Sequence, residues 1–213
     1  MTMKAKSATR RTGRVLRYAS ETLCLEFANT LAWRKSDAPE ERLSSPDALL
    51  AWCVDAGILG AGYAGQLRQG WKKRPEEAAA LHREAVELRE AIYRIFRAII
   101  RREPLPSDAL ETLNARLSAA PPRICVAPSE DAVGWWVGSR QPEPADVLAP
   151  IAWSAADMMT GPRAGRVREC ADDKGCGWLF LDESRAGTRR WCSMGECGNR
   201  AKARRHYLRR KLP

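Results

Sequence analysis

Four cysteines near the C-terminus have the spacing of a metal site. Cys170 and Cys176 form a C-x5-C pair, and Cys192 and Cys197 form a C-x4-C pair. Zinc held by four thiolates needs two such pairs, because a tight local turn gathers two ligands at a low cost in chain entropy. A closed four-thiolate site leaves no coordination position open for a substrate. We therefore expect one structural Zn²⁺ with these four cysteines as its ligands.

Two alternatives for the same four cysteines stay open. One is a cluster of reduced thiols without metal, and the other is a redox sensor whose thiolates are oxidised and release the metal. The remaining cysteines, Cys24, Cys53 and Cys125, are scattered among apolar neighbours. That placement indicates buried free thiols rather than disulfide partners.

The residues between the two pairs indicate how the second pair reaches the first. Residues 177–182 and 189–192 are predicted as two strands, and 183–188 as the turn between them. Such a hairpin would carry the second pair of cysteines back onto the first.

A helix is predicted to follow the hairpin directly. Ser193 and Glu196 have the spacing of a capping box, which predicts a helix from about residue 194 to residue 210. Cys197 then lies in the first turn, where the positive end of the helix dipole favours a thiolate. The tight turn that carries the first pair, Cys170 and Cys176, is called the knuckle below. A knuckle, a hairpin and ligands at the start of a helix are together typical of a treble-clef-like zinc finger.

This predicted helix carries one sign of charge. At 100° per residue, Cys197, Ala201 and Leu208 form a narrow apolar stripe that we expect to face the hairpin. Almost every other position is basic or polar, and like charges three or four residues apart repel each other. Binding to a polyanion would relieve that repulsion. We expect the helix to bind duplex DNA through Asn199, Arg200, Lys202, Arg204, Arg205, Arg209 and Arg210, of which Asn199, Arg200 or Arg204 would reach base edges.

The distribution of charge along the chain supports a local basic surface. The chain has a net charge of +10; residues 163–213 hold 14 Lys and Arg against 6 Asp and Glu, and residues 18–162 hold 16 against 20. Residues 1–17 hold 6 basic residues and no acidic one. The basic character lies at the two ends, and neutralising phosphates with release of counterions is its expected use.

Other partners are compatible with the same helix. It could bind structured RNA, or dock on an acidic protein partner, or be a solvated face without a partner. A single small finger buries little DNA surface, so a homodimer is also expected for high specificity.

The rest of the chain is predicted to be mainly helical, with small β-hairpins. Helices are expected at 46–56, where Ser45 and Pro46 are a start signal, at 75–102, at 107–119 with Ser107 as N-cap, and at 144–159. A hairpin is expected over 123–127 and 133–138, with Trp135 and Trp136 covering its two faces. The apolar run 23–30 is compatible with a short strand or with a helix start.

These elements give a domain organisation. We expect a basic disordered tail over 1–17, a helical domain over 18–160, a linker over 161–165 and the zinc finger over 166–213. With 213 residues, the chain has room for one medium domain and one small module stabilised by metal.

The sequence argues against an enzyme and against a membrane protein. Its two histidines stand in no nucleophile motif, it has no Gly-rich phosphate loop, and the cysteine pattern is not an open three-ligand zinc site. No apolar run approaches the roughly 18 residues that span a bilayer, and the N-terminus lacks a signal-peptide core. We expect a soluble, cytoplasmic protein.

Two stretches resemble known families. The residues from Cys170 to Arg205, and above all Cys-Gly-Asn-Arg at 197–200, closely resemble the CGNR zinc-finger family. The region 23–160 looks like the ABATE domain that precedes this finger in bacterial proteins, through Leu-Glu-Phe-Ala-Asn-Thr at 25–30 and Leu-Arg-Glu-Ala-Ile-Tyr at 88–93. Glu26 departs from the family, which often has Asp there. The resemblance implies stress-linked transcription regulators whose finger binds DNA and whose first domain senses an effector.

A small-molecule effector would need a pocket in the helical domain. The candidate pocket residues are Asn29, Trp33, Arg89 and Tyr93. Arg89 is of most interest, because an arginine among apolar residues of a helix could meet an acidic ligand, although Glu26 or Glu90 could serve as its partner. The alternative for all four is structural: a buried amide pairs with the backbone and the aromatic rings fill the core.

Overall fold

The computed structural model describes residues 15–16, 20–129, 132–137, 144–172 and 174–211. The described part is mainly helical and carries three small antiparallel sheets, as the sequence predicts. No helix within these ranges is long and apolar enough to cross a membrane.

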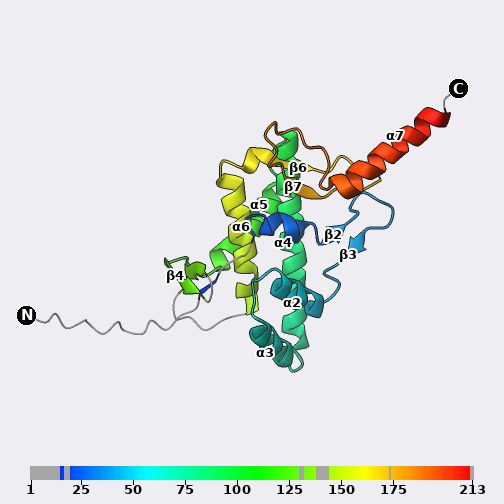
Figure 1. The fold of residues 1–213 in the computed structure, drawn as a ribbon. Coiled ribbons are helices and arrows are strands. Elements are labelled where there is room, and N and C mark those ends of the chain that lie inside the picture. The colour runs from blue at the N-terminus through cyan, green and yellow to red at the C-terminus, as the bar shows by residue number, and fades with distance from the viewer. Residues whose placement is uncertain (1–14, 17–19, 130–131, 138–143, 173, 212–213) are drawn as a thin grey trace, which may run out of the picture.

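One long helix organises the helical domain. Helix α4 (Pro75–Arg101) runs the length of this domain (Figure 1) and matches the prediction for 75–102. Leu81, Ala85, Leu88 and Ile92 are buried along it, so the stripe predicted from their spacing is the core-facing side. Around it pack the helices α1 (Leu23–Ala28), α2 (Pro46–Asp55), α3 (Ala61–Trp71), α5 (Ser107–Ala119) and α6 (Ala149–Thr160), the last preceded by a 3-10 turn, η1 (Pro144–Leu148).

Most helix starts follow the predicted local chemistry. The Ser45 side chain accepts a hydrogen bond of 3.1 Å from the Ala48 amide and caps α2. Helix α5 begins one residue earlier than expected: Ser107 is its first helical residue and Pro106 precedes it as the cap. The apolar run after residue 22 is the helix α1 and not a strand, and five of its six residues are buried.

Helix α3 is absent from our sequence prediction. Gly62, Gly65 and Gly70 weaken the helical pattern of this segment, since each glycine costs about 1 kcal/mol relative to alanine. The burial of Ala64 and Trp71 against the rest of the domain outweighs that cost. Tertiary packing therefore overrides local propensity here.

A three-stranded sheet covers one side of the helical domain. Strands β4 (Cys125–Ser129) and β5 (Ala132–Trp136) form the predicted hairpin. Strand β1 (Val15–Leu16) pairs with β5 opposite Trp135 and Trp136. The prediction of a disordered tail over 1–17 is therefore wrong for residues 15–16, and residues 1–14 lie outside the described ranges. A second small sheet joins β2 (Leu31–Ala32) to β3 (Glu40–Glu41).

The hairpin of the C-terminal region has a different partner from the predicted one. Strand β7 (Leu179–Leu181) pairs with β6 (Val167–Glu169), which follows a 3-10 turn, η2 (Ala164–Arg166). Pairing of 177–182 with 189–192 is therefore wrong. Val167, Leu179 and Leu181 belong to the same buried core as α4, so this hairpin completes the helical domain and carries the finger on it.

All seven cysteines are free thiols. Cys24 and Cys53 are buried as predicted, and burial raises the pKa of each thiol to about 12. Cys125 is half-buried. The other four cysteines gather in one place.

Candidate metal centre and nucleic-acid interface

The four predicted ligands meet at one point. The sulfur atoms of Cys170, Cys176, Cys192 and Cys197 all lie within 4.8 Å of one another. The Sγ atoms of Cys176 and Cys192 are 3.6 Å apart, as are those of Cys192 and Cys197. A tetrahedral zinc with Zn–S bonds of about 2.3 Å requires sulfurs about 3.8 Å apart. The arrangement therefore fits one structural zinc.

The cluster also has the chemistry of a cation site. Hydrogen bonds from Cys176 and Cys192 lower the pKa of Cys170, whereas the hydrogen bond with Cys170 raises the pKa of Cys192. Four thiolates this close repel one another and cannot all ionise alone. A divalent cation removes that repulsion, so zinc binding and deprotonation are coupled.

Backbone contacts of the finger bring the cysteines together. The Cys170 amide donates to the Trp178 carbonyl at 2.8 Å, and the Cys192 amide approaches Cys170 Sγ at 3.4 Å. The arm before Cys192 is tied to the knuckle by the Ala171 amide, which donates to the Arg190 carbonyl at 2.8 Å. These contacts replace the predicted hairpin of 177–182 with 189–192.

The fourth cysteine lies at the start of a helix, as predicted. The Ser193 side chain accepts a hydrogen bond of 3.3 Å from the Glu196 amide, which is the expected N-cap. A single π turn, η3 (Met194–Gly198), contains Cys197 and leads into α7 (Asn199–Lys211). The π turn widens the first turn of the helix and is typical of functional sites.

Arg200 joins the metal centre to the helical domain. Its Nη2 donates to Cys197 Sγ at 2.9 Å and to the buried Asp172 carboxylate at 2.6 Å. The guanidinium also lies over the Trp33 ring, with 4.7 Å from Cζ to the ring centroid. Hydrogen bonds to ligand sulfurs orient and stabilise a metal site. The sequence analysis missed Asp172 and this use of Arg200, although an arginine three residues after a ligand and an acid two residues after another were visible signals.

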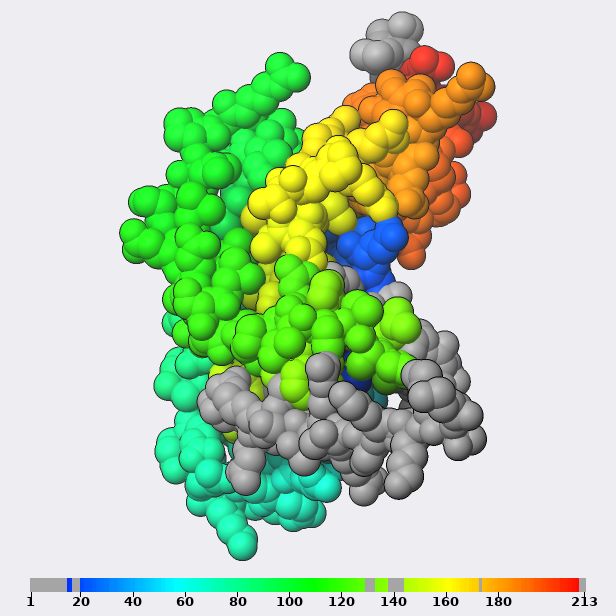
Figure 2. All heavy atoms as spheres, turned by 90° about the vertical axis from the view of Figure 1, so that its left-hand side faces the viewer, coloured from blue at the N-terminus to red at the C-terminus, as the bar shows by residue number. Residues whose placement is uncertain are grey.

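Helix α7 projects from the molecule. In Figure 1 it extends away from the helical domain, and in Figure 2 the finger lies at the end of the molecule opposite α3. Every residue from 202 to 210 is exposed. The predicted apolar stripe is wrong beyond Ala201: Leu208 is 52% exposed and faces no hairpin. The contacts described for the root, from Asn199 and Arg200, fix the start of the helix.

The predicted DNA-binding residues divide into two groups along α7. Asn199 and Arg200 lie at the root, where the Asn199 side chain donates to the Gly195 carbonyl at 2.9 Å. The rest lie on the projecting part: Lys202, Arg204, Arg205, Arg209 and Arg210. Seven of the thirteen residues of α7 are Lys or Arg and none is acidic. The exposed Tyr207 among them is a further candidate that the sequence analysis did not name.

Two of the four predicted pocket residues connect the helical domain to the finger. The Asn29 side chain pairs with the Leu179 backbone, donating to its carbonyl at 2.8 Å and accepting from its amide at 2.9 Å. The Tyr93 hydroxyl lies 3.0 Å from both the Gly177 carbonyl and a Glu169 carboxylate oxygen. Trp33 lies at the same junction, under Arg200.

Gly175 is also part of this junction. Its φ of +100° is in the left-handed region, and a Cβ atom there would lie 2.4 Å from the Ser36 amide. The Lys35 amide donates to the Gly175 carbonyl at 3.0 Å. Only glycine lets the two backbones approach so closely.

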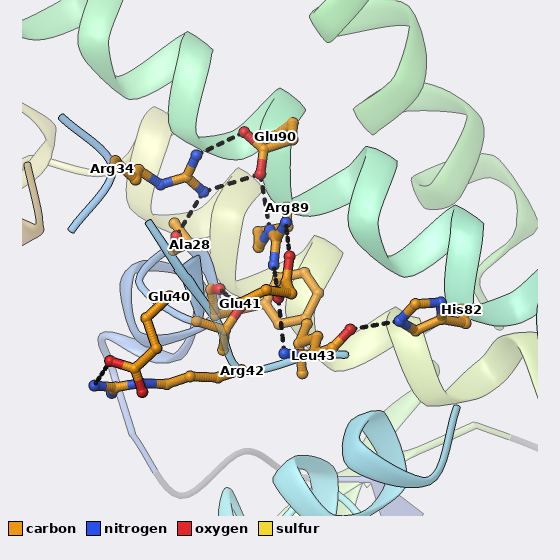
Figure 3. Close-up of polar contacts among 11 residues, drawn as sticks. Ala28, Arg34, Glu40, Glu41, Arg42, Leu43, His82, Arg89 and Glu90 are labelled. Carbon is orange, nitrogen blue, oxygen red and sulfur yellow. Dashed lines mark hydrogen bonds and ion pairs between the residues drawn. The ribbon is translucent and has the colours of Figure 1, made fainter. Parts of the chain in front are cut away.

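The fourth predicted pocket residue, Arg89, lies in an ion-pair network instead (Figure 3). Its guanidinium donates to both Glu41 oxygens at 2.6 and 2.7 Å and to Glu90 at 2.8 Å. Glu90 is paired in turn with Arg34 at 2.6 Å. Glu90 was one of the two partners considered from the sequence, and Glu41 was not foreseen. The network fixes β3 on α4, and within it Arg89 has two carboxylate partners, Glu41 and Glu90.

The metal centre, the basic helix and the helical domain agree with two family assignments. Residues 21–162 match the ABATE family, described as "Putative stress-induced transcription regulator", and residues 166–210 match the CGNR zinc finger. A search of curated proteins gives no match to the chain. Both families are of regulator and zinc-finger types. The chain therefore belongs to the ABATE family and carries a CGNR zinc finger after its ABATE region.

Proposed function

We propose that this protein is a transcription regulator that binds duplex DNA through α7, with one structural zinc fixing the helix to the helical domain. The observation that carries the proposal is the projecting basic helix: residues 202–210 are exposed and α7 has no acidic residue. A helix with this composition gains little from the protein itself, because its like charges repel one another. A nucleic acid supplies the missing opposite charge.

The dimensions of α7 suit the major groove. Thirteen residues span roughly 20 Å, and the major groove is wide enough to admit an α-helix. Basic side chains project on several sides of the helix, so a helix in the groove has donors facing both phosphate strands. Lys202, Arg205, Arg209 and Arg210 are assigned to phosphates, and Asn199 and Arg204 to base edges.

Arg200 has a different role in this proposal. Its guanidinium is engaged by Asp172 and Cys197, and leaving them would break an ion pair of 2.6 Å whose carboxylate is fully buried. Arg200 therefore acts on DNA binding by holding the root of α7, and not by touching DNA.

Selection from a random pool of duplexes tests the proposal. The zinc-loaded protein is incubated with the pool at near-physiological salt, and bound duplexes are sequenced. The matched control ends after Ala201: it keeps the four cysteines and Arg200 but lacks the projecting part of α7. We expect an enriched motif for the full chain and none for the control. A two-fold motif supports the homodimer, and RNA that outcompetes duplex DNA contradicts the proposal.

A further inference from the structure

A cavity of about 620 Å³ lies where the helical domain meets the finger. Trp33 and Arg42 line it from the helical domain, Trp178 from the loop before β7, and Glu196 and Arg200 from the root of α7. Three of the zinc thiolates form part of its wall. A zinc ion lies about 2.3 Å from its sulfurs and occupies only that edge. The volume of the whole cavity lies within the usual range for a small-ligand site, about 300–1,000 Å³.

The walls of this cavity offer flat surfaces for stacking. The Arg200 guanidinium lies 4.7 Å from the Trp33 ring centroid, and the Arg42 guanidinium 5.4 Å from the Trp178 ring centroid. Both tryptophans are only half-buried. Indole rings and guanidinium planes are the groups on which proteins stack unpaired nucleic-acid bases. The cavity therefore favours a planar ring system.

The backbone holds Trp33 in place at a cost. Its φ of +55° is in the left-handed region, which a bulky residue rarely adopts because it is strained there. The Ser36 amide and hydroxyl both donate to the Trp33 carbonyl, at 2.9 and 2.8 Å, and stabilise this turn. Such strain concentrates at ligand sites.

Arg42 and Glu196 supply complementary hydrogen-bonding groups. In Figure 3, Glu41 points into the ion-pair network, whereas Arg42 and Glu40 point away from it. The Arg42–Glu40 contacts are long, 3.3 and 3.5 Å, and both side chains are about half exposed, so the pair is weak and exchangeable. Arg42 can donate to a ligand acceptor, and the exposed Glu196 carboxylate can accept from a ligand N–H.

The charges around the cavity favour a neutral ligand. A zinc ion with four thiolates carries a formal charge of −2, and Glu196 adds a further negative charge. Arg42 and Arg200 offset this only in part, because Arg200 already neutralises Asp172. A phosphate group would be repelled by the thiolates.

We propose that this cavity binds the base of a guanine nucleoside. Guanine is planar and uncharged, presents the acceptors O6 and N7 that arginine binds in bidentate fashion, and carries amino and imino N–H groups for a carboxylate. Arg42 takes the first edge and Glu196 the second, while the ring packs between Trp178 and the stack that Arg200 forms with Trp33. Because Glu196 and Arg200 belong to the root of α7, occupancy also sets the orientation of that helix, a consequence that rests on the proposed function.

Calorimetric titration of the zinc-loaded full chain with guanosine, without DNA, tests the proposal. We expect saturable binding that weakens about tenfold or more in Trp178→Leu and in Arg42→Gln. The matched control is Arg68→Gln, because Arg68 is 47% exposed like Arg42 and is paired with an exposed carboxylate, but lies on α3. Its affinity should equal that of the unaltered chain, and all variants should retain one zinc.

Further ligands define the class. Guanosine 5′-monophosphate should bind several-fold more weakly than guanosine, because its phosphate approaches the thiolates. Cytidine should not compete. The proposal is overturned by the absence of guanosine binding, by unchanged affinity in both cavity variants, or by tighter binding of the nucleotide. If a single-stranded guanine oligonucleotide binds and guanosine does not, the cavity takes an extruded base, and the proposal of a free nucleoside is overturned.

The proposed function can fail separately. Guanosine binding is measured without DNA, so a chain that binds guanosine but no duplex refutes the regulator and keeps the cavity. A chain that binds duplex DNA but no guanosine refutes the cavity proposal and leaves the proposed regulator standing.

Discussion

The helical domain and the finger are stabilised by different means. Among the described residues, the main core holds 31 buried apolar residues, most of them from helices α1 to α6 and the others from the connections between them and from β6 and β7. The finger core holds four, Cys170, Cys176, Phe180 and Cys197, and three of these are zinc ligands. Apolar burial stabilises the first region, whereas the second has too little apolar surface and depends on the metal.

The part that depends on the metal is smaller than the finger region of the sequence. Strands β6 and β7 lie within the finger region of the sequence but belong to the core of the helical domain. The metal-dependent part is therefore confined to the knuckle, the arm before Cys192 and the root of α7. Tyr93 and Gly175 attach this part to the helical domain, and Asn29 holds the neighbouring strand β7. The comparison predicts that metal loss unfolds one part and leaves the other intact.

The largest effect is expected from Cys192→Ser. Structural zinc contributes about 10–16 kcal/mol in zinc-finger peptides, and loss of one thiolate should remove the ion from this site. Zinc content should fall from one per chain to nearly none, and amides of residues 174–176 and 183–200 should exchange rapidly while those of α4 stay protected. Elemental analysis and hydrogen exchange measure this. Cys125→Ser is the control, and full zinc content in Cys192→Ser would rule out this ligand.

Arg89→Met should produce the largest loss within the helical domain. It leaves Glu41 and Glu90 without their shared partner on α4, and we expect the free energy of unfolding to fall by about 3 kcal/mol. Arg94→Met is the matched control: Arg94 lies on the same helix and makes a similar bidentate pair with Asp108, but both groups are exposed. That variant should lose little or no stability, because an exposed ion pair is screened by solvent. Equal losses in denaturant titrations would contradict the role of burial.

Asn29→Ala should loosen the attachment of the finger. The variant leaves the Leu179 amide and carbonyl without their side-chain partners, which should cost about 2 kcal/mol. Asn114→Ala on the exposed surface of α5 is the control. Hydrogen exchange at Leu179 should accelerate in the first variant only, and unchanged exchange there would show that the amide pair does not hold the junction.

Because the ion-pair network around Arg89 contains carboxylates, we expect the stability of the helical domain to depend on pH. Burial raises the pKa of Glu41, but hydrogen bonds from Arg89 and Leu43 outweigh it and lower the pKa below its unfolded value. Its contribution is therefore complete above an unfolded pKa of about 4.3 and is lost as the pH falls below that through the lower folded pKa. Glu41→Gln should flatten the acid limb by less than about 1 kcal/mol, since the side chain is partly exposed. Glu40→Gln is the neighbouring control, and an identical acid limb in Glu41→Gln and the parent chain would contradict the assignment.

The smallest effect is expected from Arg205→Ala. Removing one phosphate contact should weaken binding to all duplexes alike and reduce the slope of log K against log salt by about one unit. Arg68→Ala on α3, far from the finger, should leave the slope unchanged. An unchanged slope in Arg205→Ala would remove this residue from the contact set.

The sequence predicts those features that depend on local chemistry. The four cysteines, the cap at Ser193, the core stripe of α4 and the cap at Ser45 each follow from spacing or from a single side chain. Helix α3, the partner of β7 and the exposure of Leu208 depend on tertiary packing, which spacing does not report. The same holds for Glu41, because its partner Arg89 is 48 residues away.

The candidate pocket residues show this limit most clearly. The sequence predicts Asn29, Trp33 and Tyr93 as pocket residues of the helical domain, and the structure brings all three to the junction with the finger. No local pattern indicates that their partners lie about 80 to 170 residues downstream. Only Trp33 lines the cavity at that junction, and its neighbours Arg42 and Trp178 come from elsewhere in the chain.

The most direct test of the central claim is the salt dependence of binding to a duplex of about 20 base pairs. The zinc-loaded full chain is compared with the chain ending after Ala201, which keeps the metal centre and loses the projecting part of α7. For the full chain we predict tight binding, with a slope of log K against log salt of about −0.9 per contacted phosphate and hence of about −3 or steeper. For the shorter chain, at equal zinc content, we predict no measurable binding. Equal affinity and slope for the two chains would contradict the account.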